Sequence, residues 1–397
     1  MNIKPKNYYM NNLIRLLSML TVAGFILTSC EGPMGPAGKD ANESCTTCHN
    51  SEVVEAKVIE YDHSLHFSGE AFEEGTRNNC APCHSHQGFL NVIEKKTPVT
   101  FTPNPADATK FINNYVAEAS ALNLPGRITC FTCHDSLHTS YTQEDFMPLS
   151  TVAEVPMTMW GGSKKINFAK TSSNLCAKCH QPRPVTAASG NVIDYSKLVS
   201  APTTTYNLSS ISYRTGIHYG SHGAIAAGVG AIEFGTGYTN SVHVTSASCA
   251  LCHMSAPSGL AGGHSFNAAG SFTGCNVSGC HSTMSATNTT YTVAVADVKA
   301  KLTALATKIN AIGAGKDILQ KDPTDNQYNG YFDIFDASAN PTGYWKNPSQ
   351  GNVAFPALTN AQFGAILNYQ LVFRDASKGI HNYPYVKKLL ENTIAAI

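Results

Sequence analysis

The sequence predicts a mainly helical fold with much irregular structure, and three observations support this prediction. A motif of two cysteines and a histidine, Cys-x-x-Cys-His, occurs five times between positions 45 and 253. Charged residues make up only 14% and aromatic residues only 9% of the 397 residues, which is thin for a large conventional core. Alternating apolar patterns are few, and 151–162 alternates well enough to predict one extended segment.

The repeated motif places its three side chains on one face of a single helical turn. The cysteines lie at positions i and i+3 and the histidine at i+4. Two thiols at this spacing can bond to the two vinyl groups on one edge of a haem while the adjacent imidazole reaches the iron, so the motif indicates a covalently attached c-type haem. The five motifs are CTTCH (Cys45, Cys48, His49), CAPCH (Cys80, Cys83, His84), CFTCH (Cys130, Cys133, His134), CAKCH (Cys176, Cys179, His180) and CALCH (Cys249, Cys252, His253).

A longer motif, CNVSGCH, follows at Cys275, Cys280 and His281, with four residues between its cysteines instead of two. The same attachment geometry is kept if the extra residues, including Ser278 and Gly279, bulge outward. The sequence therefore predicts six haems. Zinc sites also use Cys-x-x-Cys pairs and are the alternative for a single motif, but they do not need a histidine directly after every pair.

The remaining cysteine and the charge balance narrow the possible partners. Twelve of the thirteen cysteines belong to the six motifs, which leaves Cys30 and no pair for a disulfide. The 27 basic and 27 acidic residues balance, so nothing in the charge indicates nucleic acid or an acidic membrane surface as partner.

The N-terminal segment predicts export and a lipid anchor. Basic residues precede an apolar run at 16–27 that is too short for a comfortable membrane span, so 1–29 is predicted to be a secretory signal peptide. The residues Leu-Thr-Ser-Cys that end at Cys30 resemble a bacterial lipobox, which would make Cys30 the lipidated first residue of the mature protein. A simple signal peptide with an incidental cysteine is the alternative. The segment 30–43 then carries the lipidated cysteine and a collagen-like, extended tether.

Nine further histidines are available as second ligands to the irons. Fifteen histidines less six motif histidines leave nine, which exceeds the six that complete bis-histidine ligation would need. Each iron needs a sixth ligand or an open position for a substrate, and any single histidine can instead lie on the surface or in a core. The nine are His63, His66, His86, His138, His218, His222, His243, His264 and His381.

Several longer segments resemble bacterial multihaem cytochromes c of the broad group that includes the hydroxylamine-oxidoreductase and pentahaem nitrite-reductase relatives. These segments are YDHSLHFSG before CAPCH, SNLCAKCHQPR at 173–183, IHYGSHGA at 217–224, TNSVH before CALCHM, GGHSF, and the closing NYQLVFRDASKGIHNYPYVKKLLENTI. The chain has no Cys-x-x-Cys-Lys, the lysine-ligated active-site motif of the nitrite reductases, so an equivalent of their catalytic haem is absent from the motif pattern. What the resemblance implies is distal ligation by His66, His218, His243, His264 and His381, and His138, four residues after His134, completes a preferred set of six.

The pattern changes after the last motif, and 286–397 is predicted to be a helical segment that packs on the six-haem domain at 44–285. Apolar residues fall at helical spacing in three stretches, the first of them running from Val298 to Ile312 before Gly313. A second helix follows Thr359, and Pro384 opens a third. His381 lies in the turn between the last two. Elsewhere the sequence predicts a helix over 51–67 and loops wrapped over haems at 97–114 and 184–212.

The predicted array favours electron transfer. The leading hypothesis is a lipid-anchored electron carrier or conduit in the envelope of a diderm bacterium, held at the outer membrane and facing the periplasm or the cell surface, with redox proteins of the envelope as partners. One alternative is an oxidoreductase that acts on a small nitrogen or sulfur oxyanion at one open haem. Another is a structural or docking subunit, a homo-oligomer or a filament-forming cytochrome.

Overall fold

The structure is a computed structural model that describes residues 50–77, 80–94, 101–104, 107–113, 125–135, 148–185, 193–206, 211–322 and 324–397. Its contacts divide the chain into two compact units, Met1–Val58 and Ile59–Ile397. The first unit is described only from residue 50 onward, where it forms the start of a helix. The second unit contains five of the six predicted haem motifs and all of the C-terminal helices.

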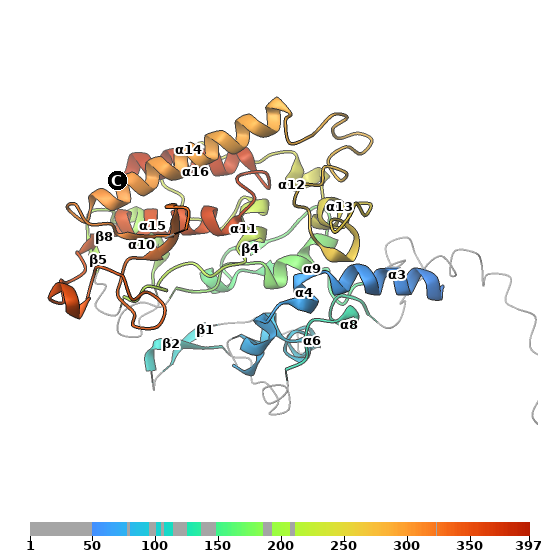
Figure 1. Cartoon of the computed structure of the whole chain (residues 1–397), viewed down its shortest axis with the longest axis horizontal. Coiled ribbons are helices and arrows are strands. Elements are labelled where there is room, and N and C mark those ends of the chain that lie inside the picture. Colours follow the sequence, from blue (N-terminus) through green and yellow to red (C-terminus); the bar gives the residue numbers. More distant parts are fainter. Residues whose placement is uncertain are drawn as a thin grey trace, which may run out of the picture. The chain divides into compact units, whose positions relative to one another are not determined.

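Four of the five described motifs lie on short helices joined by irregular segments, whereas the motif at 275–281 lies in turns (Figure 1). The helix predicted over 51–67 is confirmed but broken in two, because the Ser64 side chain accepts a hydrogen bond from the backbone N–H of Phe67 and starts a new turn. The short helices that precede or carry motifs are α3 (Ser51–Asp62), α4 (Leu65–Ser68), α5 (Ala81–His84), α6 (His86–Glu94), α8 (Cys130–Cys133), α9 (Ser172–Cys179), α12 (His243–Ser246) and α13 (Cys249–His253). The fold is thus mixed helical with much irregular structure.

The strands of the described residues form four small antiparallel pairs. They are β1 (Phe101–Asn104) with β2 (Asp107–Asn113), β3 (Val155–Pro156) with β4 (Lys165–Ile166), β5 (Thr205–Tyr206) with β8 (Leu358–Thr359), and β6 (Leu319–Lys321) with β7 (Tyr328–Phe332). The loop predicted at 97–114 is therefore wrong where β1 and β2 pair. Phe, Thr and Ile at the paired positions are residues that favour a pleated backbone, and they outweigh the polar composition of the segment.

Two more predictions of local structure are corrected. The extended segment predicted at 151–162 keeps only β3, and then turns into a 3-10 helix, η2 (Thr158–Trp160), that ends at Gly161 with φ 56°. The turn forms because the backbone N–H of Thr158 donates to the side chain of Gln181, 2.9 Å away, instead of to a neighbouring strand. The loop predicted at 184–212 contains α10 (Tyr195–Ser200), whose first turn is capped by the Asp194 carboxylate.

Three C-terminal helices form the main hydrophobic core, as the apolar spacing predicted. They are α14 (Thr289–Ala311), α15 (Asn360–Asp375) and α16 (Tyr383–Ala396), drawn in orange and red in Figure 1. α15 begins with a capping box in which the Thr359 hydroxyl and the Gln362 side chain satisfy each other's backbone N–H groups. The core also includes residues of α10 and of the segment around Ile217 and Ile232, so the helices pack against the region that bears the motifs.

Helix α15 lies inside this core and holds neighbouring loops through its polar side chains. Fourteen of its sixteen residues are buried. The Gln370 side chain accepts from the backbone N–H of Ile217 at 2.9 Å and donates to the carbonyls of Thr215 and Gly330 at 3.0 and 2.8 Å. Asn368 likewise satisfies both backbone groups of Ile232. The loop that ends at His218 is therefore fixed to the centre of the core.

Among the residues that the structure describes, no helix combines the length and the apolar character needed to cross a bilayer. The predicted signal peptide at 1–29 and the tether at 30–43 lie outside the described residues.

Candidate haem-ligand site

The structure describes five of the six motifs. Cys30, the first motif (Cys45, Cys48 and His49) and the distal candidate His138 lie outside the described residues, so the predictions made for them stay predictions. The described cysteines form no disulfide. Within the same ranges, no group of three or more His, Cys, Asp or Glu side chains is arranged to hold a bare metal ion.

Each of the five described motif histidines has a second histidine nearby, and the second histidines are the five that the family resemblance implied. Their elements are far apart in the sequence, so the pairing arises from the tertiary fold. The ring centroids are 6.1 Å apart for His84 and His218, 6.3 Å for His134 and His264, 6.1 Å for His180 and His66, 6.1 Å for His253 and His381, and 6.2 Å for His281 and His243.

This separation suits two imidazoles on opposite sides of one metal ion. A metal–nitrogen distance of about 2 Å on each side, with each ring centre about 1 Å beyond its nitrogen, gives a centroid separation of about 6 Å. Aromatic ring packing allows a wider range of centroid separations, about 4.5 to 7 Å, with planes at favoured angles. The five separations differ by only 0.2 Å whereas the interplanar angles range from 35° to 86°, which fits a common ligation distance better than ring packing.

The hydrogen bonds of these histidines also leave the correct nitrogen for an iron. In metal-binding histidines one ring nitrogen is usually held by a carbonyl or carboxylate, which fixes the ring and leaves the other nitrogen for the metal. Here a hydrogen bond holds Nδ1 in four rings. The partners are the Ala71 carbonyl for His84 (2.9 Å), the Phe266 carbonyl for His253 (2.9 Å), the Ile380 carbonyl for His243 (3.3 Å) and Asp375 for His381 (2.7 Å). Glu60 lies 3.5 Å from Nδ1 of His264 as an ion-pair contact.

The longer motif keeps the backbone geometry of the standard ones. In three standard motifs the backbone N–H of the histidine donates to the carbonyl of the first cysteine, at 2.8–3.0 Å. In CNVSGCH the N–H of His281 donates to the carbonyl of Cys275 at 3.1 Å, despite the two extra residues. Gly279, with φ 85°, makes the turn that absorbs them. The same backbone hydrogen bond therefore joins the histidine to the first cysteine in the longer motif and in these standard motifs.

Comparison with known proteins places these features in a group. No family model matches the chain. Over 160 residues it is 27% identical to the C-type polyheme cytochrome OmcC of Geobacter sulfurreducens, a match that covers 38% of this chain and 19% of that protein. The chain is a relative of the multihaem c-type cytochromes. The relationship implies haem iron.

A second comparison concerns the fold of this cytochrome. A solved structure titled "Outer Cell Wall Cytochrome OcwA" aligns with 86% of this chain and 50% of its own, at a TM-score of 0.43 and 17% sequence identity. The cytochrome therefore spans half of that chain, and its match covers about a fifth of OmcC.

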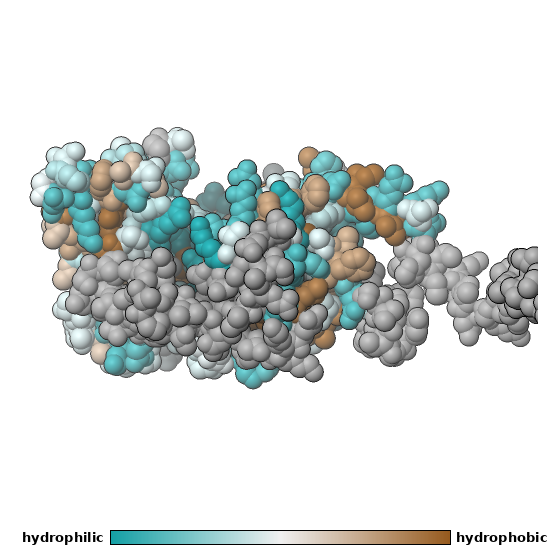
Figure 2. Space-filling view, turned by 90° about the horizontal axis from the view of Figure 1, so that it is seen from below, coloured by the Kyte–Doolittle hydropathy of each residue, from teal (hydrophilic) through white to brown (hydrophobic). Residues whose placement is uncertain are grey.

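The surface of the cytochrome near its motifs is suited to an apolar cofactor. Figure 2 shows hydrophobic surface interspersed among hydrophilic residues on one face of the molecule. Three large hydrophobic side chains beside proposed ligands are exposed: Leu65 (85%) precedes His66, Phe131 (61%) lies inside CFTCH, and Val242 (74%) precedes His243. Exposed apolar area costs about 25 cal/mol per Å², and the face of a porphyrin is a surface that such side chains can pack against.

Burial lowers the pKa of five paired imidazoles, which favours the neutral form that binds a metal; they are His66, His84, His180, His218 and His253. Burial lowers the pKa of His180 to about 3, with further lowering by nearby His222. Burial also lowers the pKa of His218 to about 3, helped by the charge of Arg183. His381 differs: burial disfavours its charged form, but the charge and the hydrogen bond of Asp375 outweigh burial and raise its pKa.

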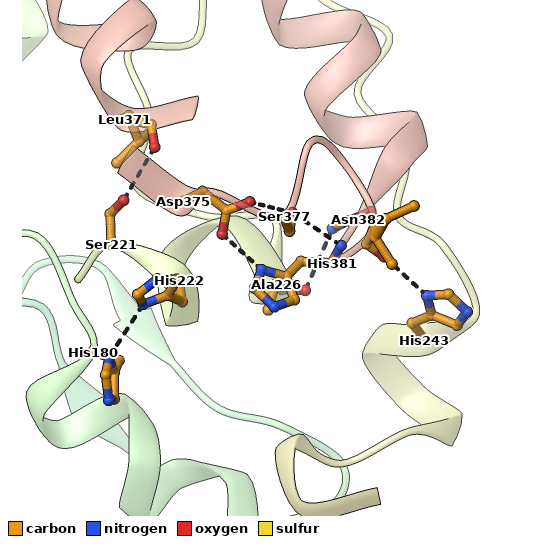
Figure 3. Close-up of polar contacts among 11 residues, drawn as sticks. His180, Ser221, His222, Ala226, His243, Leu371, Asp375, Ser377, His381 and Asn382 are labelled. Atoms are coloured by element: carbon orange, nitrogen blue, oxygen red, sulfur yellow. Dashed lines mark hydrogen bonds and ion pairs between the residues drawn. The ribbon is translucent and has the colours of Figure 1, made fainter. Parts of the chain in front are cut away.

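Two features of this site were missed by reasoning from the sequence. One is the position of His222, whose ring lies 5.1 Å from that of His180 and 6.0 Å from that of His381, with the two Nδ1 atoms of His180 and His222 at 3.1 Å (Figure 3). Nε2 is then the nitrogen of His180 that remains for an iron. The other is the pair of carboxylates, Glu60 and Asp375, for which no spacing in the sequence gives a signal.

Proposed function

We propose that this cytochrome carries six covalently bound haems and transfers electrons along them as a lipid-anchored protein of the cell envelope. The observation that carries the proposal is the pairing of five motif histidines, each with ring centroids 6.1–6.3 Å from a second histidine. His49 and His138 complete the set. Its partners are then redox proteins of the envelope.

Complete bis-histidine ligation favours a carrier over an enzyme. An iron with two imidazole ligands has no open position, so the haem exchanges electrons without binding a substrate. The chain's own contribution is to fix individual rings. Hydrogen bonds to backbone carbonyls hold Nδ1 of His84, His243 and His253, and a hydrogen bond to Asp375 holds Nδ1 of His381. Burial of the rings then keeps water and small ligands from competing for the same sites.

The packing of the motif helices supports a continuous path for electrons. α9 packs against both α5 and α13. The backbone N–H of Cys249 donates to the hydroxyl of Ser173 at 3.1 Å, and the Cys83 sulfur lies 3.9 Å from the carbonyl of Lys178. Thiols of neighbouring motifs also influence each other, because the Cys179 thiol lowers the pKa of Cys83 and the Cys176 thiol lowers the pKa of Cys249. Haems bonded to these sulfurs would have adjoining edges, with the haem of CAKCH at the junction.

The proposal is tested by the stoichiometry and spin state of the purified protein. Intact mass spectrometry is expected to give six haems, and the EPR spectrum to show low-spin iron alone. Neither nitrite nor hydroxylamine should bind or turn over. A native high-spin haem that binds nitrite and reduces it would overturn the carrier assignment in favour of the oxidoreductase, and a count of five would remove CNVSGCH.

The choice of His66 as the second ligand at CAKCH has its own test, because His222 is also close to His180. His66→Ala is expected to convert one low-spin haem to high-spin and to open it to cyanide. His222→Ala is the matched control and should leave every haem low-spin, because His222 contacts Nδ1 of His180 and leaves Nε2 for the iron. The reverse result would assign the ligand to His222.

The anchor is tested separately from the haems. Cys30→Ala should move the protein from the membrane to the soluble fraction, because acyl chains contribute about 0.8 kcal/mol per buried CH₂ to attachment. Haem content should be unchanged. A variant that still sediments with membranes would point to another anchor or to a membrane-bound partner.

A further inference from the structure

His381 is bound by a carboxylate that is more deeply buried than any other Nδ1 partner with a charge in the described part of the chain. Asp375 Oδ1 lies 2.7 Å from His381 Nδ1, and the Asp375 side chain has no exposed surface (Figure 3). The opposite member of the histidine pair, His253, has a neutral partner at the same position, the carbonyl of Phe266 at 2.9 Å. The hydrogen bond to the His381 ring is therefore charge-assisted, and the hydrogen bond to the His253 ring is not.

The local backbone holds this carboxylate in place. Asp375 is the last residue of α15, and the next residue, Ala376, takes a left-handed conformation with φ 56° that reverses the chain. The hydroxyl of Ser377 donates to Asp375 Oδ2, and the backbone N–H of His381 donates to the same hydroxyl at 3.3 Å. The two carboxylate oxygens therefore have different partners, and Oδ1 is directed at the imidazole.

The other histidine pairs supply a comparison. The Nδ1 atoms of His84 and His243 bond to backbone carbonyls, at 2.9 and 3.3 Å. Glu60 reaches His264 Nδ1 at 3.5 Å, but its side chain is 17% exposed and the same oxygen accepts from the backbone N–H of His264 at 2.8 Å. A hydrogen bond to a buried, ionised acceptor is shorter and roughly twice as strong as one to a neutral acceptor.

We propose that Asp375 is a positioning residue that makes His381 the strongest electron donor among the distal ligands and so gives the haem of CALCH the lowest potential of the five described sites. A carboxylate on Nδ1–H draws the proton and raises the basicity of the other ring nitrogen. A more basic ligand stabilises oxidised iron relative to reduced iron. This assignment rests on the proposed ligation by His253 and His381.

The test compares Asp375→Asn with the unmodified holoprotein in a spectroelectrochemical titration. The amide keeps the shape of the side chain and removes its charge. The potential of one redox step should rise by about 59 mV, which corresponds to an about tenfold change in the ratio of oxidised to reduced iron for a one-electron couple. All haems should stay low-spin. Glu60→Gln is the control, because it neutralises a carboxylate beside a different proposed ligand, His264, and it should not move that step.

Three outcomes would overturn the assignment. They are unchanged potentials in Asp375→Asn, an equal shift of the same step in Glu60→Gln, and a high-spin haem in Asp375→Asn, which would mean that the carboxylate only holds the ring in place. If Asp375→Asn does not accumulate, the unmodified protein decides: the haem that becomes high-spin in His381→Ala must be the one with the lowest potential among the five. If His381→Ala leaves every haem low-spin, the proposed ligation fails first.

Discussion

The C-terminal helices and the first haem motifs are held together by different means. In 289–397 large apolar residues such as Leu305, Phe363 and Tyr385 are at most 1% exposed and belong to one continuous core. In the described part of 59–135 the buried apolar side chains are those of Cys80, Ala81, Pro82 and Phe89. The first region shares a continuous apolar core with residues of 159–234, whereas the described part of the second has few buried apolar side chains of its own.

Removal of haem is expected to have the largest effect and to act on one region only. Protein made without haem attachment should lose protection in α5 and α8, because ligation and attachment supply folding free energy there. Helix α15 should keep slow amide exchange. Hydrogen exchange measured by mass spectrometry distinguishes the two regions, and equal loss of protection in both would contradict the comparison.

The same substitution, Phe to Ala, made once in each region is expected to give the next largest difference in the free energy of unfolding. Phe363→Ala removes a fully buried ring that stacks on Tyr206 at 4.5 Å, and should cost about 3–5 kcal/mol of the free energy of unfolding. Phe131→Ala removes a ring that is 61% exposed and should cost less than about 0.5 kcal/mol by its own contacts. Denaturant titration of the holoproteins measures both. A Phe131→Ala cost as large as that of Phe363→Ala would show a protein core at CFTCH.

A smaller effect tests where the two regions are joined. Gln370→Leu leaves the backbone N–H of Ile217 and two carbonyls without their partner and should cost about 1–3 kcal/mol. Because Ile217 precedes His218, part of one haem should also become high-spin in the EPR spectrum. Asn368→Leu breaks a similar set of bonds to Ile232 and should lower stability without changing any haem. Identical EPR spectra for the two variants would contradict the proposed link between α15 and the ligand His218.

Local sequence patterns predicted the elements that depend on local interactions. Apolar spacing, with a start after Thr359 for the second helix and Pro384 for the third, predicted three helices that the structure contains. Short strands were missed because β5 pairs with β8 across more than 150 residues of sequence, and a two-residue strand carries no period of its own. The segment 151–162 alternates like a strand but lacks a partner long enough to keep it extended.

The same division between local sequence patterns and long-range contacts applies to the candidate site. Motif spacing and the resemblance indicated which histidines to consider. The pairing of His84 with His218, or of His253 with His381, depends on loops that only the packed core brings together. Asp375 lies six residues before His381, a separation with no fixed meaning in a turn, so its role became visible only with the fold.

Helix α15 carries contacts to several ligand loops on one buried element. Gln370 holds the backbone before His218, the Leu371 carbonyl accepts from the Ser221 hydroxyl beside His222, and Asp375 binds His381. Tightly packed interiors are stiff and yield little under load. These rings should therefore hardly move when an iron gains or loses an electron, which keeps the reorganisation energy small. The buried position of α15 would then make electron exchange fast in both directions without a conformational change.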